Sequence, residues 1–292
     1  FNGELRFDQQ MAVVALINNR IGTLSAATAF GKSVVAANII AERKTNTLIL
    51  VHTRALMEQW QSVLNKFLTI ECDAPIEKPR RGRKRIWSPI GCVGSGKDRR
   101  SGLIDIAIMQ SLMDGDSVKE WVRDYGMVIV DECHHLSAFS FEKIMRFANA
   151  RYVYGLTATP IRKDGHQPII FMQCGAIRHS VIANSTTTYE RILTPRFITS
   201  KRRAEDNEPY TATIRCLAED RVRNELIVRD AVDAINRGRT PIILTALTSH
   251  TECLCEMLKP YCKNVVKLVG ADSVKQKRLA MEQMRAVEAN ED

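Results

Sequence analysis

The 292-residue sequence has no apolar run that approaches a membrane span. Runs such as residues 48–51 and 127–130 fall far short of the roughly 20 residues that a helix needs to cross a bilayer. We therefore expect no membrane partner. The start also lacks the charged and apolar regions of a secretion signal. Because the eight cysteines are scattered and not grouped as in a disulfide framework, we expect reduced thiols and a cytoplasmic protein.

Apolar residues make up 45% of the chain and charged residues 26%, which is enough to bury the core of one large or two ordinary domains. Lys and Arg together number 42 against 33 Asp and Glu, so the formal net charge is +9. This excess favours an anionic partner, and nucleic acid is the first candidate.

Short apolar segments alternate with stretches of helical spacing, a rhythm typical of a parallel sheet with crossover helices. No repeat of 20 to 50 residues is present. The predicted fold class is therefore α/β. The pattern predicts strands over residues 47–51, 104–109, 127–130, 152–156, 242–246 and 265–269, and helices over 9–17, 33–42, 54–67, 139–148, 221–236, 249–258 and 273–287.

The composition changes between residues 186 and 220, where threonines, a basic triplet and an acidic run interrupt the apolar rhythm. We expect a complete domain over residues 1–185, an irregular connection over 186–220, and the first part of a second domain over 221–292. The second domain is expected to be incomplete because it has only about 70 residues. The chain begins with Phe1 instead of Met, which we interpret as a piece of a longer protein.

A phosphate-binding loop is predicted where residues 21–28 form a strand and turn ahead of Gly31, Lys32 and Ser33. Backbone N–H groups at a helix start bind phosphates, the lysine adds positive charge, and the serine hydroxyl ligates Mg²⁺. The pattern departs from the usual one because Ala26 occupies the first glycine position. A second match, residues 91–97, keeps both glycines but has Asp98 where a hydroxyl residue is needed, so we interpret it as a basic turn.

Two adjacent carboxylates, Asp131 and Glu132, follow the apolar strand predicted over residues 127–130. Ligands of open α/β sheets bind at the carboxyl ends of the strands. We expect Asp131 to hold Mg²⁺ and Glu132 to orient and deprotonate the attacking water.

Three segments in this order, residues 31–33 (GKS), 131–134 (DECH) and 157–160 (TATP), resemble motifs I, II and III of superfamily 2 helicases. The sequence is most similar to the DEAD/DEAH-type group that includes restriction-enzyme motor subunits and xeroderma-pigmentosum-type repair helicases. The resemblance covers about residues 1–290. It implies RecA-like domains that bind ATP and Mg²⁺ and act on nucleic acid, DNA being favoured and RNA not excluded.

The resemblance also implies roles for individual residues, several of which depart from the family pattern. It implies that the second RecA-like domain supplies arginines from a Gln-x-x-Gly-Arg-x-x-Arg motif, which these 292 residues lack. The residues expected to contact the nucleotide are Arg6, Gln9 (at the adenine), Thr28, Ala29, Phe30, Gly31, Lys32 and Ser33. His134 would join Lys32, Asp131 and Glu132 in catalysis, and Thr157 and Thr159 would couple hydrolysis to movement. The residues expected to contact nucleic acid are Thr53, Arg54, Gln110 and Ser111. Ala29 stands where the family usually has glycine, and Met109 where a threonine is usual.

A basic run completes the predicted nucleic-acid surface. Six of the eight residues from 78 to 85 are cationic, and no acid occurs between Glu77 and Asp98. Such a run gives phosphate affinity without sequence specificity, and a solvated loop remains the alternative. The cations assigned to nucleic acid are Arg80, Arg81, Arg83, Lys84 and Arg85, with Lys78 beside them.

The sequence thus predicts an ATP-dependent helicase or translocase motor, with a nuclease or other effector as a further partner. The alternative is a non-catalytic module that binds nucleic acid under the control of ATP, which Ala26, Ala29 and the absent arginine motif favour. A small-molecule kinase does not explain the segment at residues 157–160.

Overall fold

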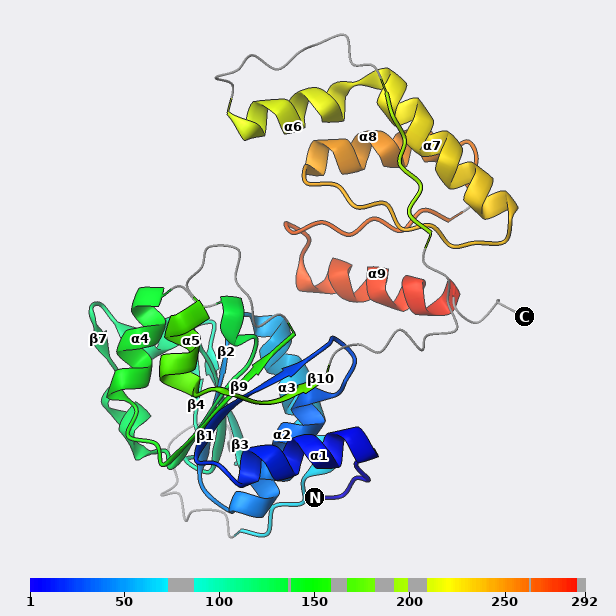
Figure 1. Cartoon of the computed structure of the whole chain (residues 1–292). Coiled ribbons are helices and arrows are strands. Elements are labelled where there is room, and N and C mark those ends of the chain that lie inside the picture. The colour runs from blue at the N-terminus through cyan, green and yellow to red at the C-terminus, as the bar shows by residue number, and fades with distance from the viewer. Residues whose placement is uncertain are drawn as a thin grey trace. The chain divides into compact units, whose positions relative to one another are not determined.

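The computed structural model describes residues 1–72, 87–135, 138–158, 167–181, 192–198, 209–262 and 264–287. The chain divides into two compact units, Phe1–Glu190 and Arg191–Asp292. Figure 1 shows a sheet with helices in the first unit and a group of helices in the second.

The first unit is built on a sheet that has eight strands within the described residues, in the order β10-β1-β9-β8-β2-β5-β3-β4. Neighbouring strands are parallel except for the antiparallel pair β3 and β4. The strands are β1 (Ile21–Ala26), β2 (Thr47–Val51), β3 (Ile90–Gly94), β4 (Lys97–Arg99), β5 (Ile104–Ile108), β8 (Met127–Val130), β9 (Tyr152–Thr157) and β10 (Ile177–Val181); β6 (Met113–Asp114) and β7 (Ser117–Val118) form a separate ribbon.

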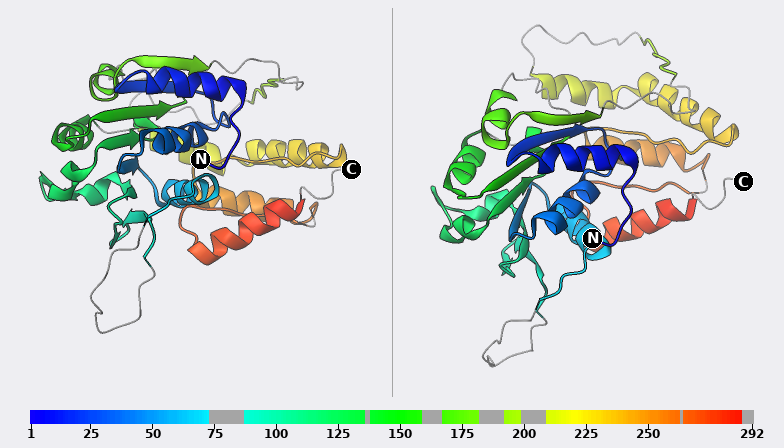
Figure 2. Two further views of the ribbon diagram at one scale, coloured as in Figure 1. Left: turned by 90° about the horizontal axis from the view of Figure 1, so that it is seen from below. Right: turned by 60° about the horizontal axis from the view of Figure 1, so that its bottom comes forward.

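Helices cover both faces of this sheet, as two further views show (Figure 2). One face carries α1 (Phe7–Ile17), α2 (Lys32–Arg43) and α3 (Arg54–Phe67); the other carries α4 (Ala138–Phe147), α5 (Gln167–Cys174) and the short 3₁₀ helices η1 (Met109–Leu112), η2 (Glu120–Asp124) and η3 (Cys133–His135).

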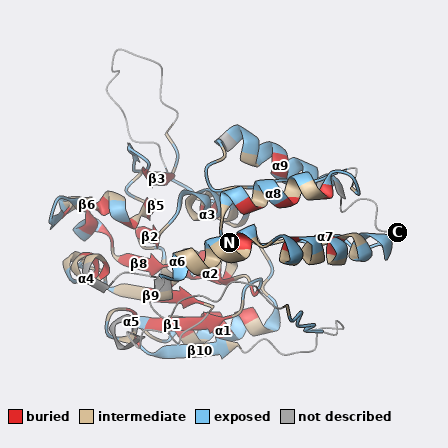
Figure 3. Ribbon diagram, turned by 90° about the horizontal axis from the view of Figure 1, so that it is seen from above, coloured by how far each residue is buried: buried red, intermediate tan, exposed pale blue. Residues whose placement is uncertain are grey.

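Strand β2 shows how this layering follows from the sequence. Successive side chains of a strand point to opposite faces. Ile49 and Val51 join the core beneath α1 to α3, whereas Leu48 and Leu50 join the core beneath α4. All five residues of β2 are therefore buried, and so are all four residues of its neighbour β8 (Figure 3). A strand covered on both faces is typical of a parallel sheet, which confirms the predicted fold class.

The parallel register brings five strand ends together. Ser25 pairs with Thr157, Val130 with both Gly155 and Leu50, and Val51 with Ile108. The carboxyl ends of β1, β9, β8, β2 and β5 therefore share one edge of the sheet. This is the edge at which open α/β sheets bind their ligands.

The second match to a phosphate loop belongs to a hairpin. Cys92 pairs with Arg99 and Gly94 with Lys97 in the antiparallel ladder of β3 and β4. No helix begins there within the described residues, so the segment lacks the helix N-terminus that binds phosphate. The interpretation as a turn agrees with residues 95 and 96, which connect the two strands.

The second unit differs from expectation in two places. It contains α6 (Tyr210–Glu219), α7 (Arg221–Asn236), α8 (Thr248–Leu258) and α9 (Val274–Val287) among its described residues. Helix α6 lies inside the expected irregular connection, because its apolar residues Ile214, Leu217 and Ala218 have helical spacing. The strands predicted over 242–246 and 265–269 are not formed, since neither segment has a ladder partner among the described residues.

No helix in the described part of the chain is both long enough and apolar enough to cross a membrane.

Candidate active site

The loop between β1 and α2 has the backbone of a phosphate-binding turn. Gly31 precedes α2 with φ at 88°, and Ala29 also lies in the left-handed region, with φ at 70°. The positive φ favours glycine at position 31, and a Cβ atom there would also lie 2.6 Å from Gln9 Nε2 and displace that amide. Ala26 is the last residue of β1 and is not among the described residues with positive φ, so its side chain does not strain this turn.

Lys32 is buried at the start of α2, with an exposed fraction of 9%. Its ammonium Nζ donates a hydrogen bond to the Ala26 carbonyl at 3.0 Å and lies 3.8 Å from Glu132 Oε1. A buried ammonium needs such partners. The lysine therefore bridges the loop between β1 and α2 and the acidic segment that follows β8.

Arg6 and Gln9 both bind the loop backbone. The Arg6 guanidinium and Gln9 Nε2 donate to the Phe30 carbonyl at 2.6 and 2.8 Å. Gln9 Oε1 accepts a hydrogen bond from the Arg6 N–H at 3.0 Å, and Gln9 is 4% exposed. The structure thus places both residues beside the predicted nucleotide loop. Thr28 and Ala29 are exposed on the same loop, and Ser33 is partly buried in the first turn of α2.

Asp131 follows β8 directly and is held on three sides. Its backbone N–H donates to the Leu50 carbonyl at 3.0 Å, its Oδ1 accepts from the Glu132 N–H at 3.0 Å, and its Oδ2 accepts from Trp60 Nε1 at 2.7 Å. Burial raises the pKa of the Asp131 carboxyl above its ordinary value; the Trp60 hydrogen bond opposes this rise and the Glu132 charge adds to it. A cation at this place would favour the ionised form.

Glu132, His134 and Thr157 form a cluster at the same sheet edge. His134 Nδ1 lies 2.8 Å from Thr157 Oγ1 and 3.3 Å from Glu132 Oε2. Within the described part of the chain, buried Glu132 Oε2 makes no hydrogen bond. The acidic segment after β8 is therefore joined to the end of β9 through His134.

The predicted nucleic-acid residues follow two adjacent strands, β2 and β5, at the same sheet edge. Thr53 caps α3 just after β2, accepting a hydrogen bond from the Leu56 N–H at 3.2 Å, and Arg54 follows it. Gln110 and Ser111 lie on η1, directly after β5, which pairs with β2. Thr159 and the basic residues Arg80, Arg81, Arg83, Lys84 and Arg85 lie outside the described residues.

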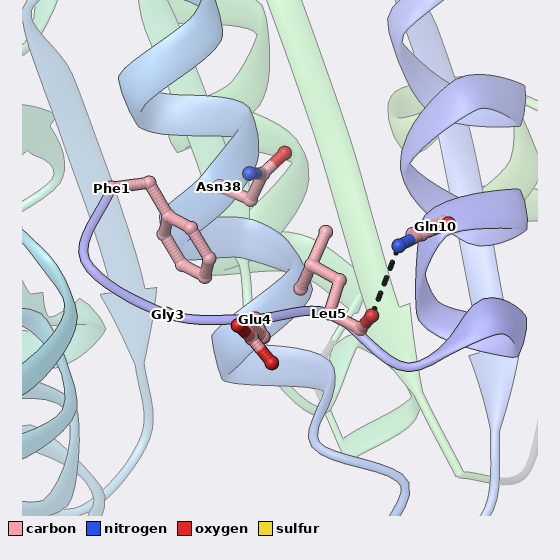
Figure 4. A pocket seen from close by; sticks show the side chains of 6 residues that line it. All are labelled: Phe1, Gly3, Glu4, Leu5, Gln10 and Asn38. Atoms are coloured by element: carbon pink, nitrogen blue, oxygen red, sulfur yellow. Dashed lines mark hydrogen bonds between the residues drawn. The ribbon is translucent and has the colours of Figure 1, made fainter.

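A separate pocket of about 380 Å³ lies beside the N-terminal segment (Figure 4). It is lined by Phe1, Gly3, Glu4, Leu5, Gln10 and Asn38, and Gln10 Nε2 donates to the Leu5 carbonyl at 3.1 Å. Gln9 and the phosphate loop do not line this pocket, so it is distinct from the cluster of Lys32, Asp131 and Glu132.

Sequence reasoning missed Trp60. It occupies an apolar position of α3, 71 residues before Asp131, and reads as a core residue, which it also is at 2% exposed. Only its hydrogen bond to the carboxylate distinguishes it. A signal was available in its chemistry, because a buried indole N–H needs an acceptor.

The residues at the sheet edge suit Mg²⁺. The ion prefers oxygen ligands and is usually held by one or two carboxylates together with substrate phosphates. Ser33 and Asp131 supply a hydroxyl and a carboxylate from the two converging segments. Burial raises the pKa of the Asp131 carboxyl, and a bound cation would offset this rise by favouring the ionised form.

A parallel sheet with a lysine loop after one strand and a DECH segment two strands away is the arrangement expected from the resemblance to superfamily 2 helicases. Residues 2–162 match the family described as "Type III restriction enzyme, res subunit". This match covers more than half of the chain, and the chain belongs to that family.

Curated relatives and solved structures agree with this assignment. The chain is 27% identical over 273 residues to "Putative helicase 161L" of Invertebrate iridescent virus 6, covering 91% of this chain and 58% of that protein. It is 29% identical over 174 residues to "DNA 3'-5' translocase XPB2" of Sulfurisphaera tokodaii, covering 60% and 35%. The Escherichia coli DExH-box NTPase HrpB has a similar fold, with a TM-score of 0.51 at 15% identity over 94% of this chain and 32% of that one. The chain thus spans between a third and three fifths of these relatives' lengths.

Proposed function

We propose that this chain is the ATP-hydrolysing part of a nucleic-acid helicase or translocase, acting on DNA. The observation that carries the proposal is the contact between Lys32 Nζ and Glu132 Oε1 at 3.8 Å. This contact joins the loop after β1 to the acidic segment after β8, the two proposed halves of a nucleotide site. Lys32 and Asp131, in these two segments, are 99 residues apart in the sequence.

The chemistry follows from the residues at this edge. Lys32 neutralises charge on the terminal phosphates, and the N–H groups at the start of α2 bind their oxygens. Glu132 accepts a proton from the attacking water through the oxygen that has no hydrogen-bond partner among the described residues. His134 and Thr157 transmit the state of this carboxylate to β9 through their 2.8 Å contact, and Thr159 is proposed to act with them.

Ser33 and Asp131 are the residues that would hold Mg²⁺, which supplies charge neutralisation on the transferred phosphoryl group when bound. The ion is proposed from the donor chemistry of these residues and from the family's use of ATP.

Nucleic acid is proposed to cross the carboxyl ends of β2 and β5. Thr53 and Arg54 follow β2, and Gln110 and Ser111 follow the adjacent strand β5, at the edge that carries the cluster proposed to hydrolyse ATP. The basic run at residues 78–85 adds phosphate affinity. DNA is favoured because the translocase relative is named for DNA, and a nuclease or other effector is proposed as the motor's partner. The cytoplasm is the proposed compartment.

We propose that residues 1–185 form a first RecA-like domain, 186–220 a connection and 221–292 the first part of a second such domain. The apolar segments at 242–246 and 265–269 support this proposal, because Ile242 and Leu244 are 75% and 90% exposed and have no neighbouring strand within the described residues.

The test compares two variants of the nucleotide site. Lys32→Ala removes the phosphate charge, whereas Glu132→Gln keeps a side chain of the same shape. Both should abolish DNA-stimulated hydrolysis, but only Lys32→Ala should weaken ATP binding. Steady-state phosphate release and equilibrium binding of a fluorescent ATP analogue measure the two effects.

Lys143→Ala, which changes a lysine that pairs with Asp116 away from this site, is the control. Turnover in Glu132→Gln near that of the unmodified chain would contradict the role of Glu132. Hydrolysis stimulated by RNA and not by DNA would show that the nucleic-acid substrate is RNA. ATP binding without any hydrolysis would favour the non-catalytic module.

A further inference from the structure

Trp60 connects α3 to the acidic end of β8. The side chain is 2% exposed and Asp131 is 7% exposed. The indole Nε1 donates to Asp131 Oδ2 at 2.7 Å, a short distance that is typical of a hydrogen bond to an ionised group.

The carboxylate is thereby fixed at both oxygens. The Glu132 N–H binds Oδ1 and the indole binds Oδ2, so rotation about the side-chain bonds would break one of the two. Each oxygen keeps lone-pair capacity for a further ligand. Residues that bind the ligands of a metal in this way set their orientation and commonly tune metal affinity.

We propose that Trp60 is a positioning residue, which holds the Asp131 carboxylate in the orientation that receives a divalent metal bound to nucleotide. The inference rests on the proposed function, because it requires Asp131 to be the metal-binding carboxylate. It goes beyond that function by assigning a role to a side chain that does not touch nucleotide.

The place of Trp60 on α3 gives the contact a second consequence. The same helix begins with Thr53 and Arg54, the residues proposed to meet nucleic acid. Because a helix of this length is a stiff element, a shift of its N-terminus moves the indole, and with it the carboxylate. Trp60 therefore links the nucleic-acid edge to the metal position through one hydrogen bond.

The experiment measures metal binding without turnover. The chain is saturated with ADP, and Mn²⁺ is titrated while free Mn²⁺ is followed by electron paramagnetic resonance. Trp60→Phe keeps an aromatic ring but removes the N–H donor. We expect its Mn²⁺ affinity to fall about 10- to 100-fold, as is typical when a partner of a metal ligand is lost. ADP affinity in EDTA should stay within about twofold, because the phosphate loop is unchanged.

Trp121→Phe is the matched control. Trp121 lies on η2 beneath the other face of the sheet, where it contacts Tyr125 and Arg100. Its Mn²⁺ and ADP affinities should equal those of the unmodified chain.

A second measurement needs no variant at position 60. The sequence has three tryptophans, so Trp87→Phe combined with Trp121→Phe leaves Trp60 as the single indole signal in a ¹⁵N spectrum. That signal should shift when Mg²⁺ is added to the ADP complex. This spectrum decides the matter if Trp60→Phe loses ADP binding through misfolding.

The outcomes separate the two proposals. Equal Mn²⁺ affinity in Trp60→Phe and the unmodified chain, or an indole signal that Mg²⁺ leaves unmoved, would overturn the role of Trp60 while the proposed function stands. An unmodified chain that binds neither ADP nor Mn²⁺ would instead overturn the proposed function, and this role with it.

Discussion

Two residues next to the nucleotide site hold backbone conformations that residues with side chains rarely adopt. Ala29 has φ at 70° and Glu132 has φ at 46°. Such conformations cost on the order of 1–3 kcal/mol and concentrate at functional sites. For Glu132 the conformation turns the chain directly after β8, which aims the carboxylate back toward Lys32. For Ala29 no side-chain contact repays the cost, because the residue is exposed.

Ala29→Gly should therefore stabilise the chain. Glycine removes a left-handed penalty of about 1–2 kcal/mol. Glycine also gives the unfolded chain more conformational freedom, which lowers the free energy of unfolding by about 0.4–1 kcal/mol. The net gain in the free energy of unfolding is therefore expected to be about 0.5–1 kcal/mol. Urea unfolding followed by circular dichroism measures this gain.

Ala27→Gly is the matched control for this prediction. Ala27 lies two residues earlier and outside the left-handed region, so its replacement should lower the free energy of unfolding. Equal losses in both variants would show that the strain at Ala29 is not released.

At this scale the sequence predicts residues whose chemistry depends on local spacing. Lys32 follows a glycine ahead of a helix, and Asp131 and Glu132 follow an apolar strand, so each could be found from its neighbours. Trp60 could not, because its proposed role depends on a partner 71 residues away, and only the packing of α3 on the sheet brings the two side chains together.

At the scale of elements, a buried histidine joins three helices of the second unit. His250 on α8 lies with Nδ1 2.7 Å from Thr245 Oγ1 and Nε2 2.9 Å from Asn224 Oδ1 on α7. Asn224 Nδ2 donates to the Ala218 carbonyl at the end of α6. Since Asn224 Oδ1 is an acceptor, His250 Nε2 donates to it, and in the neutral imidazole Nδ1 accepts from the Thr245 hydroxyl.

The free energy of unfolding of this unit should decrease as the pH is lowered. Burial lowers the pKa of His250 below its ordinary value near 6.5, and the Arg223 charge adds to the effect. A lowered pKa means that the stabilisation is present above pH 6.5. It is lost as pH falls from there through the folded-state pKa. Urea unfolding between pH 8 and pH 5, followed by helical circular dichroism, measures the loss.

His250→Gln supplies the comparison, because it removes the titrating ring. The variant should be less stable at pH 8 but should lose less stability on acidification than the unmodified chain. Parallel losses in the two proteins would assign the pH dependence to other groups.

Helices and strands could be predicted where a long segment is periodic or buried throughout. They could not be predicted where a short segment depends on contacts with its immediate neighbours. The boundaries of α3 and α7 match the predictions, as does β8, because long periodic or fully apolar segments have one interpretation. The sequence predicts the segment of β3 and β4 only as a basic turn, because Asp98 stands where a phosphate loop needs a hydroxyl residue, and the two strands beside the turn are not predicted. Two of its glycines serve packing: a Cβ at Gly91 would lie 1.9 Å from Asp105 Oδ1, and one at Gly94 would lie 2.6 Å from Ile108 Cδ1.

For the whole molecule, we expect very slow ATP hydrolysis even with saturating DNA. Enzymes turn over at about 10 s⁻¹ on average. In related phosphoryl-transfer reactions an arginine finger raises the rate by a factor of about 10³ to 10⁵. These 292 residues lack the motif that supplies such arginines in the family. A turnover of about 10⁻⁴ to 10⁻² s⁻¹ is therefore expected. Steady-state phosphate release measures it, with Lys32→Ala as the background.

Turnover near 10 s⁻¹ would be the contrary result. It would show that the cations that stabilise the transition state lie within this chain. Arg202, Arg203 and Arg239 would then be the first residues to replace with alanine.

The short strand β4 has a consequence for how the protein behaves at high concentration. A bare β3 at the end of the sheet would offer the unpaired backbone of an apolar strand as a template for another molecule. β4 covers it with Lys97, Asp98 and Arg99, all exposed. An incoming strand would have to desolvate these charges to pair with so short an edge. The hairpin thus guards this side of the sheet against intermolecular strand addition, and charge-removing substitutions in β4 would favour aggregation.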